Sequence, residues 1–200
     1  MTQAPPSLRP ATPADVPRAV QTLTAAFAAY PWTRHTVAAD RHLWRIAHLQ
    51  DLFLRHLGLP YGRVWVAEEA QAVAVWTTPQ TAPPASLFET LEPRITELAG
   101  DRAEASAQAE ALLAQHRPTG PAWTLQTVGV HPARQGHGLG RAVLRAGLEA
   151  ADHAGLPAYL ETSSERNVRF YESLGFRVTA EVLLPGDGPL TWSMGRSAAR

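Results

Sequence analysis

The chain has 200 residues, of which 45% are hydrophobic, and its 18 basic and 18 acidic residues give a formal net charge of zero. This size and hydrophobic content are ordinary for one globular domain with a substantial core, and the neutral balance argues against general attraction to nucleic acid or an anionic membrane. Because the sequence contains no cysteine, disulfides, thiolate metal sites and a cysteine acyl-enzyme intermediate are excluded.

Hydrophobic periodicity predicts mostly helices in the first half of the chain, with an early strand and a later hairpin. Thr12 suits a helix N-cap and Asp15 the reciprocal position of a capping box, so one helix is expected to begin at residue 13. The expected elements are a strand at 7–11, helices at 13–29 and 40–57, and the two strands of a hairpin at 62–68 and 72–78. One face of the second helix is expected to contain Leu43, Ile46, Ala47, Phe53, Leu54 and Leu57.

The second half predicts a long helical region, followed by strands that alternate with helices. Residues 86–116 favour a helical segment that is interrupted near Pro93 and Gly100. The elements expected after it are strands at 123–130, 158–162, 176–184 and 189–195, and helices at 139–154 and 166–174. With neither an internal repeat nor a domain linker, this order predicts a single α/β (α+β) domain in which helices flank a mixed sheet.

A glycine-rich turn lies between the strand at 123–130 and the helix at 139–154, and residues 135–140 read Gln-Gly-His-Gly-Leu-Gly. Its glycines allow positive φ and close approach of an anion, and the following helix start offers free N–H groups, so a pyrophosphate is a plausible ligand. A Walker loop is excluded because the chain has no lysine, and a dinucleotide fingerprint fits poorly because the third glycine comes one residue early. An ordinary strand-to-helix turn remains the alternative.

A second motif lies downstream, where Asn167 and Tyr171 are spaced to share one face of a helix. Together with Gln135-x-x-Gly138-x-Gly140, it resembles the GCN5-related N-acetyltransferase (GNAT) family, whose signature is Arg/Gln-x-x-Gly-x-Gly/Ala followed by Asn-x-x-x-Tyr. The resemblance implies the GNAT fold, acetyl-CoA as cosubstrate, and direct acetyl transfer to an amine. It also implies that residues 1–120 form the acceptor side and residues 121–200 the acetyl-CoA side of one domain.

The resemblance also implies roles for individual residues. The strand at 123–130 is expected to diverge from its neighbour and bind the pantetheine arm, with the amide of Val130 directed at the thioester carbonyl. Tyr171 matches the family's general acid, which protonates the leaving thiolate. Glu161, at a strand end, is expected to relay the amine proton through water or to orient the substrate, against the alternative of a plain surface charge. The expected acetyl-CoA contacts are Val128, Gly129, Val130, Gln135, Gly136, His137, Gly138, Leu139, Gly140, Arg141 and Asn167.

Further runs extend the resemblance to those family members that acetylate the free amine of the aminonucleoside antibiotic puromycin. The runs lie at 15–20, 33–37, 72–79, 127–130 and 160–163. They imply a puromycin-like small-molecule amine as substrate and a role in antibiotic resistance. Tyr30, Trp32 and Trp123 are the aromatic residues expected to bind this acceptor. Another small-molecule amine, or a noncatalytic acyl-CoA-binding module, stays open as an alternative.

The remaining sequence signals concern metals, membranes and location. The eight histidines lack the spacing of metal ligands, so no metal site is expected. No apolar run approaches the roughly 20 residues of a spanning helix. The first six residues show neither a basic n-region nor an apolar h-region. We therefore expect a cytoplasmic protein without a membrane or nucleic-acid partner.

Overall fold

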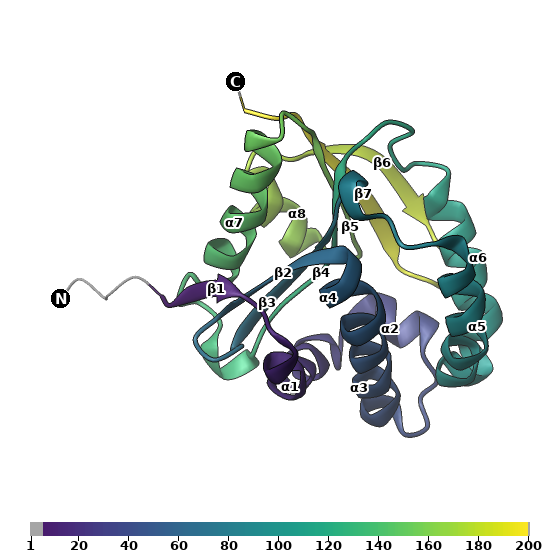
Figure 1. Ribbon diagram of the computed structural model, residues 1–200. Coiled ribbons are helices and arrows are strands. Elements are labelled where there is room, and N and C mark those ends of the chain that lie inside the picture. The colour runs from purple at the N-terminus through teal and green to yellow at the C-terminus, as the bar shows by residue number, and fades with distance from the viewer. Residues whose placement is uncertain (1–5, 200) are drawn as a thin grey trace.

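A seven-stranded mixed sheet forms the centre of the molecule in a computed structural model that describes residues 6–199 (Figure 1). Its strands are β1 (Leu8–Pro10), β2 (Gly62–Ala67), β3 (Ala72–Thr77), β4 (Trp123–Val130), β5 (Ala158–Thr162), β6 (Arg177–Leu183) and β7 (Leu190–Arg196). They are ordered β1-β2-β3-β4-β5-β7-β6, and only the pair β4 and β5 is parallel. The expected mixed sheet flanked by helices is confirmed, and most of the N-terminal stretch considered for a leader lies outside the described residues.

Helices cover both faces of this sheet (Figure 1). They are α1 (Val16–Phe27), α2 (Pro31–Thr36), α3 (His42–Phe53), α4 (Leu59–Tyr61), α5 (Ala85–Ala99), α6 (Ala103–Ala114), α7 (Leu139–His153) and α8 (Glu165–Glu172). The largest core cluster joins α7 and α8 to one face, with the fully buried Trp76 among its members. A second cluster packs α1 on the valines of β2 and β3. Alternate residues of β2 and β3 thus face opposite sides of the sheet, as the pleat requires.

Two expectations for the helical regions are wrong in detail. Residues 31–36, which lie outside the expected helices, form the short helix α2, because Pro31 occupies a first-turn position where a proline costs no hydrogen bond. Pro93 does not interrupt its segment but lies inside α5, where burial of Leu91 and Leu98 offsets the lost hydrogen bond. The expected interruption near Gly100 is confirmed, because a short 3₁₀ turn at Gly100–Arg102 separates α5 from α6.

The apolar face expected for the helix at 40–57 is narrower than its sequence pattern indicates. Ile46 and Leu54 are buried, but Leu43 is 56% exposed and Phe53 is 37% exposed. The pattern placed all six apolar residues on one face, whereas α3 packs mainly against α1 and α5, so only part of that face is covered. Two large apolar side chains therefore remain on the surface.

A β-bulge in β4 changes which of its side chains face the α7 core cluster. Thr127 pairs with Val75 and Leu125 pairs with Trp76, so Gln126 is an extra residue opposite β3. As a result, Leu125 before the bulge and Val128 after it both pack against the α7 core cluster, although they are three residues apart. The bulge thus shifts the alternation of side chains by one residue.

The parallel pair β4 and β5 separates soon after it forms. The two strands pair only through Trp123–Leu125 and Ala158–Leu160, and the rest of β4 has no partner on that side among the described residues. His131 donates its backbone N–H to Gln71 on the β3 side, so by alternation the N–H groups of Val128 and Val130 point toward the separating β5. The expected divergence of these strands is confirmed by their pairing.

A long connection joins two strands that are direct neighbours. β3 and β4 pair antiparallel, yet residues 78–122 between them form α5, α6 and their flanking turns. Antiparallel neighbours need only a short hairpin, so this segment adds structure that the sheet itself does not require. The segment lies along one side of the sheet, apart from α7 and α8 (Figure 1).

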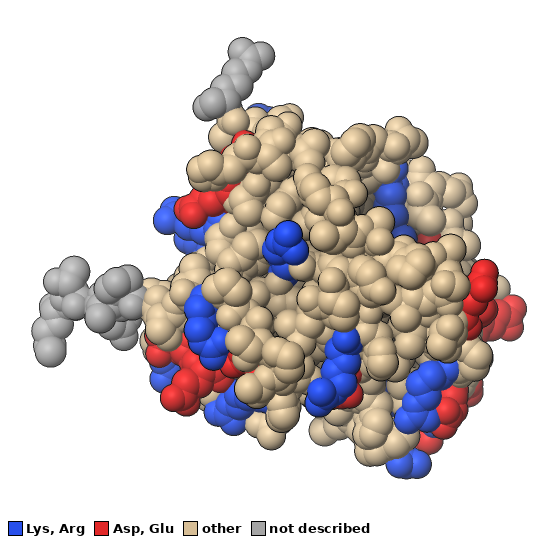
Figure 2. All heavy atoms as spheres, in the orientation of Figure 1, with Lys and Arg blue, Asp and Glu red and all other residues tan. Residues whose placement is uncertain are grey.

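The surface carries its charges in a dispersed way. On the face shown in Figure 2, arginine and acidic side chains are interspersed without a large area of one sign, in agreement with the formal net charge of zero. Within residues 6–199, no helix has the length and apolar character needed to cross a bilayer.

Candidate active site

The glycine-rich turn has the open backbone expected of an anion cradle. Gly136 and Gly138 have φ values of 80° and 78°, and a Cβ added to either would meet no atom within 4 Å. Gly138 is the N-cap of α7, whose first hydrogen bond at this end runs from Ala142 N–H to Gly138 O. The N–H groups of the first turn are thus left free for a ligand, which is where a helix attracts an anion. These residues fit a diphosphate.

Side chains around this turn bind to the protein itself. Gln135 Nε2 donates to Val130 O at 3.3 Å, and His137 Nδ1 lies 2.8 Å from Gln135 O. Arg141 Nη2 donates to Ser173 Oγ at 2.7 Å, which ties the start of α7 to the end of α8. Leu139 is buried beneath the turn. The backbone, rather than these side chains, is therefore what the turn presents outward.

Two glycines near the turn lie where a side chain would be crowded. A Cβ on Gly129 would lie 2.8 Å from Leu23 of α1, and one on Gly140 would lie 3.3 Å from Val130. Gly129 thus lets α1 approach β4, while the backbone of Val130 faces the opening between the strands. Among the β4 residues expected to contact acetyl-CoA, the side chains therefore serve packing, and the backbone groups remain available to a ligand.

A hydrogen-bond cluster joins the start of α2 to the end of β5. The hydroxyl of Tyr30 accepts a hydrogen bond from Ser163 N–H at 2.7 Å and lies 3.0 Å from Thr162 Oγ1. Asn167 Nδ2 donates to the same Thr162 oxygen at 3.3 Å. Tyr30 and Asn167, which are far apart in sequence, are thus brought to one place. Burial raises the pKa of Tyr30, although its hydrogen bonds oppose that shift.

Tyr171 lies next to this cluster, on the inner face of α8. Its side chain is only 5% exposed and packs in the α7 core cluster, with the rings of Phe170 and Phe176 beside it. Burial raises the pKa of Tyr171, and the nearby Tyr30 adds to the increase. The phenol therefore stays protonated at neutral pH, which is the form that can donate a proton.

Glu161 is held by an arginine from a distant segment. Arg117, just after α6, donates from Nε to Glu161 Oε1 at 2.9 Å and from Nη2 to Oε2 at 3.2 Å. The Tyr159 hydroxyl also lies 2.9 Å from Glu161 Oε1. Glu161 is the first β5 residue beyond those paired with β4, and its side chain is 20% exposed. It is thus a charged group at the opening whose two oxygens are both already engaged.

The three expected acceptor-binding aromatics have different environments. Tyr30 lies in the cluster described above, and Trp32 is half-buried against α6 and β6. Trp123 is only 6% exposed, with its ring packed near Trp65 and Trp76 in the α7 core cluster. Of the three, Trp123 is thus the most deeply packed, with its ring inside the core cluster.

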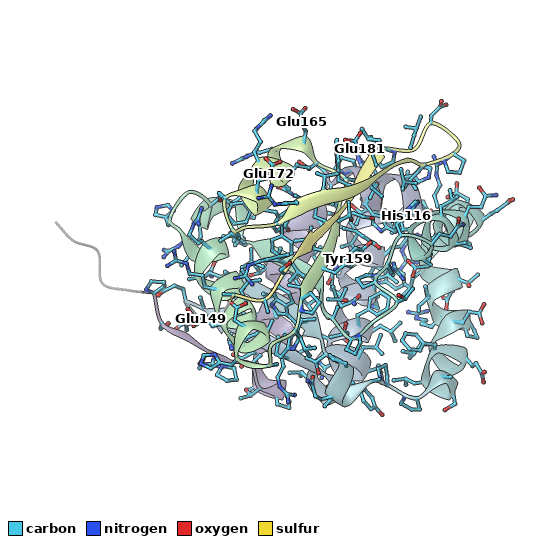
Figure 3. All side chains as sticks on the ribbon, turned by 90° about the horizontal axis from the view of Figure 1, so that it is seen from above. His116, Glu149, Tyr159, Glu165, Glu172 and Glu181 are labelled. Carbon is cyan, nitrogen blue, oxygen red and sulfur yellow. The ribbon has the colours of Figure 1, made fainter. Side chains whose placement is uncertain are left out.

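Two other glutamates on α8 point away from this region. Glu165 and Glu172 project from α8 at the periphery in Figure 3, and Glu165 forms an ion pair with Arg169 at 2.8 Å. The same view shows Tyr159 near the centre, with His116 after α6 on one side of it and Glu149 of α7 on the other. The segment that carries Arg117 thus approaches β5 from the side opposite α7.

Sequence reasoning missed Arg117, Thr162 and Ser163 as parts of the site. Arg117 lies 44 residues from Glu161, and no local pattern connects them. Thr162 and Ser163 do have a signal, because they follow Glu161 directly at a strand end next to the parallel neighbour. Polar residues at such carboxyl ends are a general indication of a binding site.

Comparison with known proteins identifies the family. Residues 27–176 match the Acetyltransferase (GNAT) family. The chain is also similar to mycothiol acetyltransferase of Nocardiopsis dassonvillei, with 49% identity over 59 residues that cover 28% of this chain and 18% of that protein. It is 41% identical over 59 residues to the L-methionine sulfoximine/L-methionine sulfone acetyltransferase of Salmonella typhimurium, which covers 28% of this chain and 34% of that protein. The chain thus matches only 18% and 34% of the length of these two relatives.

Solved structures agree over almost the whole chain. A structure titled histone acetyltransferase HPA2 and related acetyltransferase, from Corynebacterium glutamicum, superposes with a TM-score of 0.77 and 27% identity, covering 98% of this chain and 97% of that one. The yncA acetyltransferase of Salmonella typhimurium, solved with its cofactor acetyl-CoA, shares the fold with a TM-score of 0.53 and 20% identity, over 98% and 96% of the two chains. The family match, the strand separation and the glycine cradle lead to one conclusion: the chain belongs to the GNAT family of acetyltransferases.

Proposed function

We propose that this chain transfers an acetyl group directly from acetyl-CoA to the primary amine of a small molecule. The observation that carries the proposal is that Tyr30 and Tyr171 lie close together at the end of β5, where this strand leaves β4, while Glu161 lies on the opposite face of the same strand end. These residues come from three separate elements and supply a proton donor, a carboxylate and a second phenol. Direct transfer is favoured because the sequence has no cysteine to carry the acetyl group.

The residues expected to hold acetyl-CoA fit that role. Gly136 and Gly138, with the free N–H groups of α7, would hold the diphosphate, and the backbone of Val128 and Val130 would hold the pantetheine arm. Asn167 stands at the same edge, where it ties α8 to β5. When bound, acetyl-CoA supplies an activated thioester.

Three groups of the chain would then stabilise the developing oxyanion, protonate the leaving thiolate and orient the amine. The N–H of Val130 would donate to the acetyl carbonyl oxygen, and one such preorganised donor contributes about 2.7–4 kcal/mol to a transition state. Tyr171 Oη gives its proton to the departing sulfur. Glu161 orients the amine through its charge and relays to water the proton that the nitrogen loses after its attack, and it needs little basicity because an α-amino group with a pKa of about 7.7–8.0 is already partly neutral.

Puromycin is the specific acceptor that we propose. The runs at 33–37, 72–79 and 160–163 support it, as do the aromatic rings of Tyr30 and Trp32, which suit a purine and a methoxyphenyl ring. In this proposal residues 1–120 supply the acceptor side and residues 121–200 the acetyl-CoA side. The relative named for methionine sulfoximine and methionine sulfone favours a second candidate, a small amino acid.

A thiol-release assay with acetyl-CoA and a panel of amines tests the proposal. The panel contains puromycin, L-methionine sulfone, an amino acid amide and a polyamine. We expect the highest kcat/KM with puromycin and confirm N-acetylation of the product by mass spectrometry. Turnover of other amines without puromycin would overturn the specific acceptor, and tight acetyl-CoA binding without transfer to any amine would overturn the enzymatic function.

A further inference from the structure

The guanidinium of Arg117 is shared between two carboxylates. Besides its two bonds to Glu161, Arg117 donates from Nη1 to Glu110 Oε1 at 2.5 Å and from Nη2 to Glu110 Oε2 at 3.1 Å. A guanidinium has five N–H donors, so these four bonds leave almost no capacity for a further anion. Arg117 is therefore a nearly saturated cation beside the opening between β4 and β5.

Two of the three residues in this arrangement come from the long connection between β3 and β4, residues 78–122. Glu110 lies on α6 and Arg117 follows it, both within residues 78–122, while Glu161 belongs to β5. Ala158 and Leu160 face the α7 core cluster, so Glu161 points to the other face of β5, where Tyr159 also reaches Ser193. The connection thus delivers one guanidinium and one carboxylate to the face opposite α7.

The charges of the three residues do not cancel. Two carboxylates and one guanidinium give a net charge of −1, so the cluster attracts an ammonium group and repels a carboxylate. A free amino acid has its carboxylate two bonds from the amine and would bring it close to Glu161. An amine whose neighbouring carboxyl group is absent, or masked as an amide, avoids that repulsion.

We propose that Arg117 is a specificity-determining residue, which holds Glu161 in place and, because Glu110 saturates it, excludes acceptors that carry a free carboxylate beside the amine. The inference rests on the proposed acetyl transfer and deepens it. It favours amide-linked aminoacyl amines, such as the aminonucleoside proposed above, over free amino acids. Arg117 acts through Glu161 and is a positioning residue in this scheme.

Matched acceptor pairs test the inference. The thiol-release assay compares 4-methoxyphenylalanine amide with 4-methoxyphenylalanine, and L-methionine amide with L-methionine, with puromycin in parallel. For each pair we expect the amide to have a kcat/KM at least about tenfold higher than the acid. Equal or better turnover of the acids would overturn the inference while leaving the acetyl transfer intact. No thiol release with any amine would instead reject the proposed function on which the inference rests.

Variants separate selectivity from a merely structural role. E110Q removes one of the two oxygens that accept from Arg117, together with a negative charge of the cluster, so the amide-to-acid ratio should fall by about fivefold or more, and low salt should enlarge the difference. R117Q should lower kcat with the amides, and R117K should recover part of it. The control R196Q removes an ion pair of similar geometry to Asp152, at 2.8 Å, and should leave the ratio unchanged. An unchanged ratio in E110Q would show that Arg117 does not set selectivity.

Discussion

At the scale of single residues, burial determines the chemistry of Tyr171. A phenol in water loses its proton near pH 10, and the buried position of Tyr171 raises that pKa further. The shift does not favour a base, since it makes the proton harder to remove. It suits a donor that must remain protonated until a thiolate forms beside it.

Replacing Tyr171 by Phe should lower kcat by about a hundredfold, because a positioned proton donor contributes roughly 10²–10⁴ in rate. The KM for acetyl-CoA should change little, since only one hydroxyl is removed. Steady-state kinetics with varied acetyl-CoA measure both values. Tyr61→Phe is the control, because Tyr61 lies on α4, outside the proposed site, and should retain normal kcat. Normal turnover in Tyr171→Phe would exclude the phenol as the acid.

The residue scale also shows what the sequence could and could not provide. Tyr171 and Asn167 could be singled out because they match the Asn-x-x-x-Tyr motif of the family that the sequence resembles, and their spacing puts them on one helix face. The partner of Glu161 could not, because Arg117 comes from a segment whose path over the sheet has no local signal. The burial of Trp123 has no local signal either, since an aromatic residue in a strand has the same sequence pattern whether it faces the core or a ligand.

At the scale of elements, each end of α7 is flanked by a glycine with a left-handed backbone conformation, which other residues adopt only with strain. Gly138 at its start has a φ of 78°, and Gly155 beyond its end has a φ of 65°. Neither has an atom near the position of a Cβ, so a side chain at either place strains the backbone without a clash. The two positions therefore form a matched pair at opposite ends of the same helix.

Gly138→Ala and Gly155→Ala should each destabilise the protein by about 1–2 kcal/mol, the cost of a left-handed conformation with a Cβ. Only Gly138→Ala should also raise the KM for acetyl-CoA. Relief of the strain at this position would rotate the neighbouring peptide groups, so their N–H groups would no longer point at the diphosphate. Urea unfolding and acetyl-CoA titration measure the two effects. Equal acetyl-CoA affinity in both variants would argue against diphosphate binding at this turn.

Strands were easier to predict than helices in this chain. The strand at 123–130 and the strand at 158–162 have the bounds that alternation gave, since buried strands have clear polar ends. α2 and the continuous α5 were missed because prolines suggested breaks, whereas tertiary packing decided both cases. Neither the bulge in β4 nor its separation from β5 has a local pattern, because both arise from pairing between strands.

At the scale of the whole molecule, an ion pair fastens the last strand to α7. Arg196 at the end of β7 makes two bonds of 2.8 Å to Asp152 of α7, and Ala199 N–H donates to the same carboxylate. Both side chains are largely buried, with exposures of 16% and 23%. Hydrogen bonds from Arg196 hold the pKa of Asp152 below its usual value.

The contribution of this pair to stability should depend on pH. Because the pKa of Asp152 is lowered in the folded state, its stabilisation is present above the unfolded pKa of about 3.9 and is lost as pH falls through the folded pKa. Asp152→Asn should lower the free energy of unfolding by about 1–3 kcal/mol at pH 7, and by less below pH 4. Urea unfolding at both pH values measures this difference.

Asp51→Asn serves as the control for that measurement. Asp51 pairs with Arg55 on α3 at 2.9 Å, but both side chains are more than 40% exposed, so the loss should stay below about 0.5 kcal/mol. A similar loss in the two variants, or a deficit for Asp152→Asn that grows in acid, would contradict the assigned role of the Arg196 pair.

The extra residue in β4 has a consequence for how this sequence can vary. At the unpaired Gln126, odd and even positions of β4 exchange faces of the sheet. Because of this exchange, the side chains of Val128 and Val130 face α7 and Gly129 faces α1. Insertions or deletions of two residues preserve that parity, whereas a change of one reverses it and drives valine methyl groups into Leu23. Length changes in this strand are thus restricted to even numbers by the helix packed behind it.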